Sequence, residues 1–175
     1  MKFTELKLSG SYIIDMEKIP DERGFFARAW DSNIFKEKGL ISNFVQCNIS
    51  FNSKKGTLRG LHYQDSPYGE VKLVRCTRGR VFEVMVDLRK NSSTYLHWDS
   101  HELNSNDGKM LYIPENFALG FQALEDDTEL FYQMSRYYAP KFSKGLHWND
   151  PKLKILWPMK PTVISKKDNS FNYIK

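Results

Sequence analysis

The feature that most constrains the fold is a series of short apolar runs with the two-residue period of β-strands. The clearest run is Arg80–Asp87, in which apolar and polar residues alternate as in a half-buried strand. Further strand-like runs lie at Val71–Cys76, Lys109–Ile113 and Thr128–Tyr138. Many short strands joined by close turns must bury their apolar faces against one another. We therefore predict an all-β antiparallel sandwich or barrel.

Helix is scarce in this sequence. The best candidate is Asp31–Lys38, because an Asp or Ser N-cap can open it and Gly39 can end it. Turns with Gly, Pro, Asn or Asp chemistry separate the strand-like runs. They are expected at Arg78-Gly79, Asn106-Asp-Gly108, Pro114-Glu-Asn116 and Asp126-Asp127.

Composition favours a single globular domain over residues 1–175. The chain is 41% hydrophobic and 14% aromatic, which excludes a disordered or low-complexity protein. The polar tail Ser165–Lys175 is expected to fray. The net charge of +5 is scattered and suits an anionic ligand such as a nucleotide diphosphate. No basic cluster interleaved with aromatic residues indicates a nucleic-acid partner.

The cysteines and the N-terminus favour a soluble, cytoplasmic protein. Cys47 and Cys76 lie far apart and lack the spacing of a thiol redox motif or a structural zinc site. The first ten residues do not read as a signal peptide, and no stretch approaches 18 apolar residues. We expect no association with a membrane.

His62 is the most chemically suggestive of the four histidines. It lies in the segment Leu58-Arg-Gly-Leu-His-Tyr-Gln64, and an imidazole that titrates near neutral pH is suited to proton transfer. In a regular strand Arg59 and His62 would not share a face, but Gly60 can let the backbone turn and reorient them. The residues alone are equally compatible with a histidine that has no catalytic task.

Asp150 and Lys72 are the charged groups that can act with His62. Asp150, which precedes Pro151 and has aromatic neighbours, can orient an imidazole, although an Asp at this place also simply opens a turn. Lys72 lies in an apolar run. An inward-pointing amine there must meet an anion, whereas an outward-pointing one needs no partner.

The strand-like run Thr128–Tyr138 carries three tyrosines. Tyr132 and Tyr138 would share one face, and Tyr137 would take the other. Ordinary core and rim positions explain all three as well as a catalytic phenol does.

Segments that carry these residues extend over most of the chain. They are Asp21-Glu-Arg-Gly-Phe-Phe26, Gln46-Cys-Asn-Ile-Ser50, Gly56-Thr-Leu-Arg-Gly-Leu-His-Tyr-Gln64, Val71-Lys-Leu-Val74, Val84-Met-Val-Asp-Leu-Arg89 with Ser93-Thr94, Tyr132–Tyr138, and Trp148-Asn-Asp-Pro151 followed by Ile155-Leu-Trp-Pro158. In this order and spacing, from about Ile14 to Pro158, the chain resembles the dTDP-4-dehydrorhamnose 3,5-epimerase family.

The resemblance implies a cupin jelly roll, a homodimer that exchanges N-terminal strands, and an isomerase without a metal or organic cofactor. The substrate would be a nucleoside-diphosphate 4-keto-6-deoxy sugar, in the first place dTDP-4-dehydro-6-deoxyglucose, epimerised at C3 and C5 for deoxysugar biosynthesis. The C4 ketone acidifies the hydrogens on C3 and C5. A base of near-neutral pKa can therefore remove one if the enolate is stabilised.

The resemblance also implies roles for individual residues. His62, oriented by Asp150, would be the base, Lys72 would offset negative charge on the C4 oxygen, and Tyr132 would return a proton from the opposite face. The residues that match substrate-binding positions of the family are Arg23, Phe26, Gln46, Asn48, Arg59, Glu83, Leu119 and Tyr138.

The histidines do not form the metal-binding pattern of other cupins, which have two histidines separated by one residue, a nearby acid and a later histidine. Gln64 occupies the second position after His62. His97 and His101 fall in a polar stretch and are expected to face solvent. We predict no catalytic metal.

Three positions depart from the family. Leu119 stands where the family has a histidine and Glu83 where it has an aspartate, so a second His–acid pair is altered. Arg28 stands where the family commonly has a glutamate near the nucleotide. Two alternatives therefore stay open. One is inversion at C3 or C5 alone of a dTDP-, CDP- or GDP-linked 4-keto sugar, and the other is a cupin that binds a nucleotide sugar without turning it over.

Overall fold

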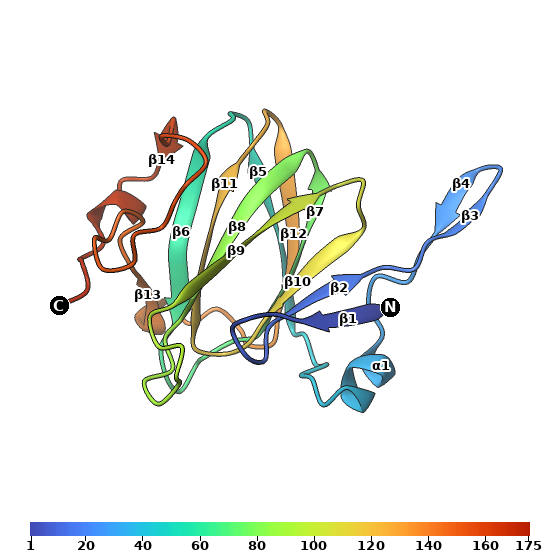
Figure 1. Ribbon diagram of the computed structural model, residues 1–175, viewed down its shortest axis with the longest axis horizontal. Coiled ribbons are helices and arrows are strands. Elements are labelled where there is room, and N and C mark those ends of the chain that lie inside the picture. The colour runs from blue at the N-terminus through green and yellow to red at the C-terminus, as the bar shows by residue number, and fades with distance from the viewer.

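Two antiparallel sheets face each other in the computed structural model, which describes residues 1–175 (Figure 1). In the first sheet the strand order is β1 (Lys2–Glu5), β2 (Tyr12–Asp15), β10 (Lys109–Ile113), β7 (Lys72–Arg78), β12 (Thr128–Met134) and β5 (Gln46–Asn52). In the second sheet the order is β13 (Ser143–Gly145), β6 (Thr57–Gln64), β11 (Phe117–Ala123), β8 (Arg80–Asp87) and β9 (Trp98–Asn104), with β14 (Val163–Ile164) parallel to β6.

From β5 onward the chain passes repeatedly from one sheet to the other, which is the connectivity of a jelly roll. A core that includes Val74, Val81, Met85, Leu111 and Leu130 fills the space between the sheets. The predicted all-β architecture is confirmed. No helix is long and apolar enough to cross a membrane.

A two-stranded hairpin, β3 (Ile19–Asp21) and β4 (Gly24–Phe26), projects away from both sheets (Figure 1). Ile19 and Phe26 are 64% and 62% exposed, so the arm carries apolar side chains that its own chain does not cover.

The helix α1 (Ser32–Glu37) forms as predicted. The Asp31 side chain caps it by accepting hydrogen bonds from the backbone amides of Asn33 and Ile34, and Gly39 follows it with φ +71°. Its Phe35 is fully buried against the outer face of the first sheet, where it packs with Leu73 and Tyr112.

Strand β8 has the predicted bounds but is buried on both faces, not one. Val84 and Val86 on its second face pack against Leu61, Ala118 and Leu153. The C-terminal segment covers this face of the second sheet. The expectation that Ser165–Lys175 frays is therefore wrong, because Asp168 in the 3₁₀-helix η2 (Asp168–Ser170) is only 4% exposed.

Two further expectations need correction. Strand β12 ends at Met134, so Tyr138 lies beyond the strand and does not share a strand face with Tyr132. The polar stretch around His101 was expected to face solvent, but it forms strand β9. The His101 imidazole is half-buried and lies 3.2 Å from the Asp99 carboxylate. The alternation of apolar and polar residues that predicts a strand is missing from β9, because polar residues occupy both of its faces.

Candidate active site

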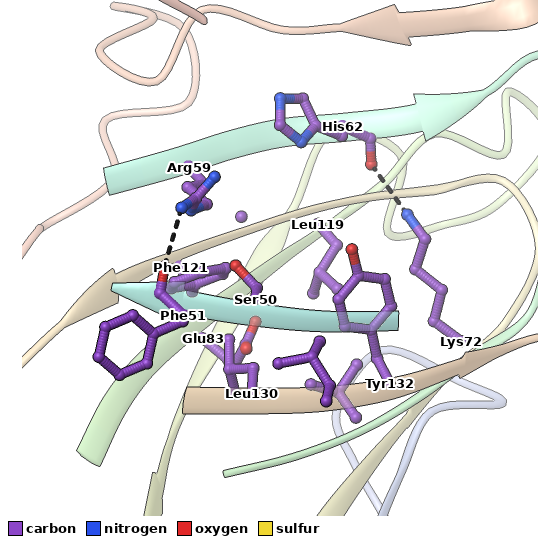
Figure 2. Close-up of a pocket in the computed structure, with 13 residues that line it drawn as sticks. Ser50, Phe51, Arg59, His62, Lys72, Glu83, Leu119, Phe121, Leu130 and Tyr132 are labelled. Carbon is purple, nitrogen blue, oxygen red and sulfur yellow. Dashed lines mark hydrogen bonds between the residues drawn. The ribbon is translucent and has the colours of Figure 1, made fainter. Parts of the chain in front are cut away.

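A cavity of about 290 Å³ opens between the two sheets (Figure 2). His62 enters it from β6 and Tyr132 from β12, on opposing sheets, and Lys72 lies beside them on β7. An adjoining hollow of about 470 Å³ shares these three residues. The fold therefore brings together an imidazole, a phenol and an amine that lie far apart in the sequence.

Glycine at position 60 allows Arg59 and His62 to line the same cavity, as predicted. Gly60 has φ +123°, and a Cβ atom there would lie only 2.5 Å from Gly120 Cα on β11. The register between β6 and β11 shifts at this point, so Leu119 pairs with His62 and Phe121 with Arg59. This irregularity turns both side chains inward.

Asp168 is the carboxylate that contacts His62. Its Oδ1 lies 2.8 Å from His62 Nε2, and its Oδ2 accepts a hydrogen bond from the Gly60 amide at 3.0 Å. Burial acts to raise the pKa of Asp168, but the hydrogen bonds from His62 and Gly60 outweigh it and lower the pKa. A carboxylate held in its charged form orients the ring with Nε2–H toward it, which leaves Nδ1 as the basic atom.

The predicted pairing of His62 with Asp150 is wrong. Asp150 is 2% exposed, and its carboxylate accepts hydrogen bonds from the backbone amides of Lys152 and Ile174. It fastens the C-terminal segment and does not contact the imidazole. No local pattern identifies Asp168 as the partner, because 106 positions separate it from His62 and it lies in a polar tail.

Lys72 is only 8% exposed and points inward. Its ammonium lies 3.1 Å from the Glu70 carboxylate and 3.5 Å from the His62 carbonyl oxygen. Gln64 also donates to Glu70, at 3.0 Å. Glu70, which the sequence did not single out, is thus the anion that an inward lysine requires, and it fixes the ammonium at the wall of the cavity.

Tyr132 faces the cavity from the strand opposite His62, paired with Asn48 and Val74 on the neighbouring strands. Burial raises the pKa of its phenol, while the nearby positive charge of Arg59 acts in the opposite direction. The phenol therefore keeps its proton at neutral pH and can donate it.

Glu83 lines the deep end of the cavity and is completely buried. Neither carboxyl oxygen has a hydrogen-bond partner. Burial raises the pKa of Glu83 to about 8, although the charge of Lys72 acts to lower it. Leu119, another lining residue, offers it no hydrogen bond.

The mouth of the adjoining hollow is polar. Gln46, Asn48, Tyr138 and Lys167 line it, and the Gln46 side chain accepts a hydrogen bond from the Tyr138 amide at 2.9 Å. Lys167, the neighbour of Asp168, was not singled out from the sequence. Arg59 stays exposed beside the first cavity, and its guanidinium donates to Asn52 and to the Phe51 carbonyl.

Arg23 and Phe26 do not reach this cavity. They lie on the projecting hairpin, where Arg23 pairs with Asp21, and both are exposed. The hydrogen bond from the Arg23 side chain, with a smaller one from its backbone amide, lowers the pKa of Asp21. Arg28 lies nearby and pairs with Asp31 at 3.3 Å, also outside the cavity.

Nowhere do three or more His, Cys, Asp or Glu side chains form a group that could hold a metal ion. The cavity offers instead an imidazole and a phenol from opposing sheets, with the Lys72 ammonium at its wall (Figure 2). The Asp168 carboxylate orients the imidazole. These groups can take a proton from one face of a carbon acid and return one to the other face. The fold and site thus define the class: a cupin-type isomerase that works by proton transfer.

Comparisons with known proteins give the family. The model of dTDP-4-dehydrorhamnose 3,5-epimerase matches residues 5–175. The epimerase of Methanothermobacter thermautotrophicus is 42% identical over 99% of this chain and 95% of its own. The crystal structure of the Bacillus anthracis epimerase, with TDP and pyrophosphate bound, has a TM-score of 0.96 at 32% identity and 99% coverage of both chains. The chain belongs to the dTDP-4-dehydrorhamnose 3,5-epimerase family.

One solved relative is informative about His62 and Tyr132. It is a double mutant of a 3′-monoepimerase from Streptomyces bikiniensis in complex with dTDP, 27% identical with a TM-score of 0.89, covering 96% of this chain and 85% of that one. Its two substitutions replace a histidine and a tyrosine whose separation along that chain equals that of His62 and Tyr132 here.

Proposed function

We propose that His62 is the base that removes a proton next to the C4 ketone of a dTDP-linked 4-keto-6-deoxyhexose, and that the enzyme inverts C3 and C5. The observation that carries this proposal is the His62–Asp168 pair at 2.8 Å on the wall of a cavity that holds Lys72 and Tyr132. The charged carboxylate stabilises the imidazolium that forms when Nδ1 takes the proton.

Lys72 and Tyr132 complete the proton transfer. When the C–H bond breaks, its electron pair moves into an enolate, and negative charge develops on the C4 oxygen. The buried ammonium of Lys72 stabilises that charge because the cavity screens it poorly. Tyr132, on the opposing sheet, then donates its phenolic proton to the other face of the carbon, which inverts the centre.

The nucleotide part of the substrate belongs at the polar mouth. Arg59 and Lys167 supply positive charge to a diphosphate, and the guanidinium fork of arginine can donate two hydrogen bonds to it. Gln46 and Asn48 on β5 add amide groups beside Lys167, and Tyr138 offers an aromatic face there, while Arg59 lies at the adjoining first cavity.

We further propose that the protein is a homodimer in the cytoplasm and that the β3–β4 hairpin completes the site of the partner. The exposed Ile19 and Phe26 on that arm need a surface to cover them. Seated on a second copy, the arm would bring Arg23 and Phe26 to a nucleotide that their own chain cannot reach.

The experiment is hydrogen exchange with dTDP-4-keto-6-deoxyglucose in deuterium oxide. Deuterium is expected at both C3 and C5, detected by NMR and mass spectrometry, and His62→Asn should abolish it. Exchange at one centre would replace two-centre epimerisation with the single-centre reaction. Absence of exchange in the unmodified enzyme would contradict catalysis on this substrate.

A further inference from the structure

Phe171 is a residue of the tail Ser165–Lys175 that contacts the imidazole of His62 directly. It follows the 3₁₀-helix η2, and the coil that carries it lies beside β6 and β13 (Figure 1). The two rings meet edge to face, with centroids 5.9 Å apart and an interplanar angle of 76°. Aromatic rings prefer this arrangement to a face-to-face stack. The tail therefore holds His62 at two places, through the Asp168 carboxylate and through the Phe171 ring.

Glycine at position 145 makes room for the Phe171 ring. Gly145 on β13 is the cross-strand neighbour of His62 on β6. A Cβ atom at position 145 would overlap the Cε2 and Cζ atoms of Phe171. The ring thus occupies the space that a side chain beside His62 would otherwise fill, and only glycine allows this close approach.

The tail is anchored on both sides of Phe171. Three residues before it, the Asp168 amide donates a hydrogen bond to Ser165 Oγ at 2.9 Å. Three residues after it, the Ile174 amide donates to the Asp150 carboxylate at 2.6 Å. These bonds fix the chain at both ends of the segment, so the Phe171 ring is held in place against the imidazole.

The hydrogen bond to Asp168 does not by itself fix the tilt of the His62 ring. The His62 side chain is 40% exposed, and its ring can pivot about Nε2 while that hydrogen bond stays within range. Proton abstraction requires Nδ1 to point at the reacting carbon, and a misplacement of about 1 Å can lower a rate roughly 100-fold. A second ring packed edge-on against the imidazole removes this freedom.

We propose that Phe171 is a positioning residue for proton abstraction. It keeps the His62 imidazole tilted so that Nδ1 faces the bound sugar while Asp168 holds Nε2. The inference rests on the proposed function, because it assumes that His62 is the base. Phe171 lines neither cavity, so it acts through His62 and not through the substrate.

The rate of deuterium exchange with dTDP-4-keto-6-deoxyglucose, corrected for the folded fraction by circular dichroism, tests the proposal. Phe171→Ala should lower kcat roughly 10-fold and leave KM unchanged. Phe171→Leu, which refills the space beside Gly145, should recover most of the rate. Tyr173→Ala is the matched control and should leave kcat unchanged. It removes an aromatic ring of the same tail that packs on His147, with ring centroids 4.6 Å apart.

Gly145→Ala tests the same contact from the other side. Its new Cβ atom should displace the Phe171 ring and lower kcat about as much as Phe171→Ala does. In the Phe171→Ala background, where the ring is gone, the same substitution should have no further effect. Nitrogen NMR of labelled histidine gives an independent measurement. His62 should show one tautomer, protonated at Nε2, in the unmodified protein and a mixture of tautomers in Phe171→Ala.

Full activity of Phe171→Ala, additive losses for the two substitutions, or an equal loss in Tyr173→Ala would each overturn the inference and leave the proposed function intact. A single unchanged tautomer in Phe171→Ala would overturn it as well. Unchanged kcat in Gly145→Ala would do the same even if Phe171→Ala fails to fold. If the unmodified enzyme shows no exchange, or His62→Asn retains it, the proposed function fails and this inference falls with it.

Discussion

The two buried acids of strand β8, Asp87 at its end and Glu83 in its middle, show how differently a strand end and the wall of the cavity are built. Asp87 at one end is 0% exposed, and its carboxylate accepts hydrogen bonds from the Arg89, Ser92 and Thr94 side chains and from the Arg89 amide. Burial acts to raise the pKa of Asp87, but these donors hold it well below its ordinary value.

Glu83 is equally buried on the same strand and makes no hydrogen bond. The two acids differ in their surroundings. Asp87 closes a loop of its own chain, whereas Glu83 faces the cavity. An acid satisfied by the fold stabilises the fold. An acid left unsatisfied keeps a binding group available, at a cost in stability.

The largest effect on activity is expected when the carboxylate of Asp168 is removed. Asp168→Asn should lower the rate of deuterium exchange roughly 10³-fold, about 4 kcal/mol, because an amide cannot stabilise an imidazolium. Rates are measured by NMR at saturating substrate, with circular dichroism to follow folding.

Asp99→Asn is the matched control, because Asp99 forms the other His–Asp pair, with His101, outside the cavity. It should leave the exchange rate unchanged. Equal losses of exchange in the two variants would show that Asp168 acts through folding and not through His62.

Substitution of Asp87 should have the opposite effect: a loss of stability without a loss of activity. Asp87→Asn leaves buried donors of Arg89, Ser92 and Thr94 without their charged acceptor, so the free energy of unfolding should fall by roughly 3 kcal/mol. Urea unfolding measures this change. The rate of deuterium exchange per folded molecule should be unchanged. A lower rate would contradict the assignment of Asp87 to stability alone.

The smallest effect should appear when Glu83 can no longer ionise. Its pKa is about 8 in the folded protein against an ordinary 4.5, so the folded state holds this proton more tightly than the unfolded state. Burial of Glu83 therefore carries no ionisation penalty below about pH 4.5, and the folded protein loses stability as the pH rises toward 8.

Glu83→Gln should remove this loss. Between pH 6 and 8 the free energy of unfolding of the unmodified protein should fall relative to the variant by roughly 1 kcal/mol per pH unit. Parallel pH profiles of the two proteins in chemical denaturation would mean that Glu83 is already ionised when folded.

Local patterns in the sequence were enough for much of the fold. Alternation predicted β8, a short apolar run predicted β10, and the Asp31 cap and Gly39 predicted α1. Burial on both faces of β8 could not be predicted, because it depends on apolar residues far along the chain, such as Leu153 and Trp157, that pack on the second sheet.

The site was partly predictable for the same reason. His62, Lys72 and Tyr132 lie on strands, and the sheet geometry brings them together. Acids on connecting segments have no such constraint. Nothing local distinguishes Asp168, which contacts His62, from Asp150, which holds the chain end, and Glu70 is identified as the partner of Lys72 only by proximity.

The long separation between His62 and Asp168 also has a kinetic consequence. The two residues are 106 positions apart, whereas β8 and β9 are joined by one short connection, so the pairing of His62 with Asp168 requires a far larger loop to close. During refolding, enzymatic activity should therefore return after the β8–β9 hairpin has formed. An intermediate can contain native hairpins and still be unable to move a proton.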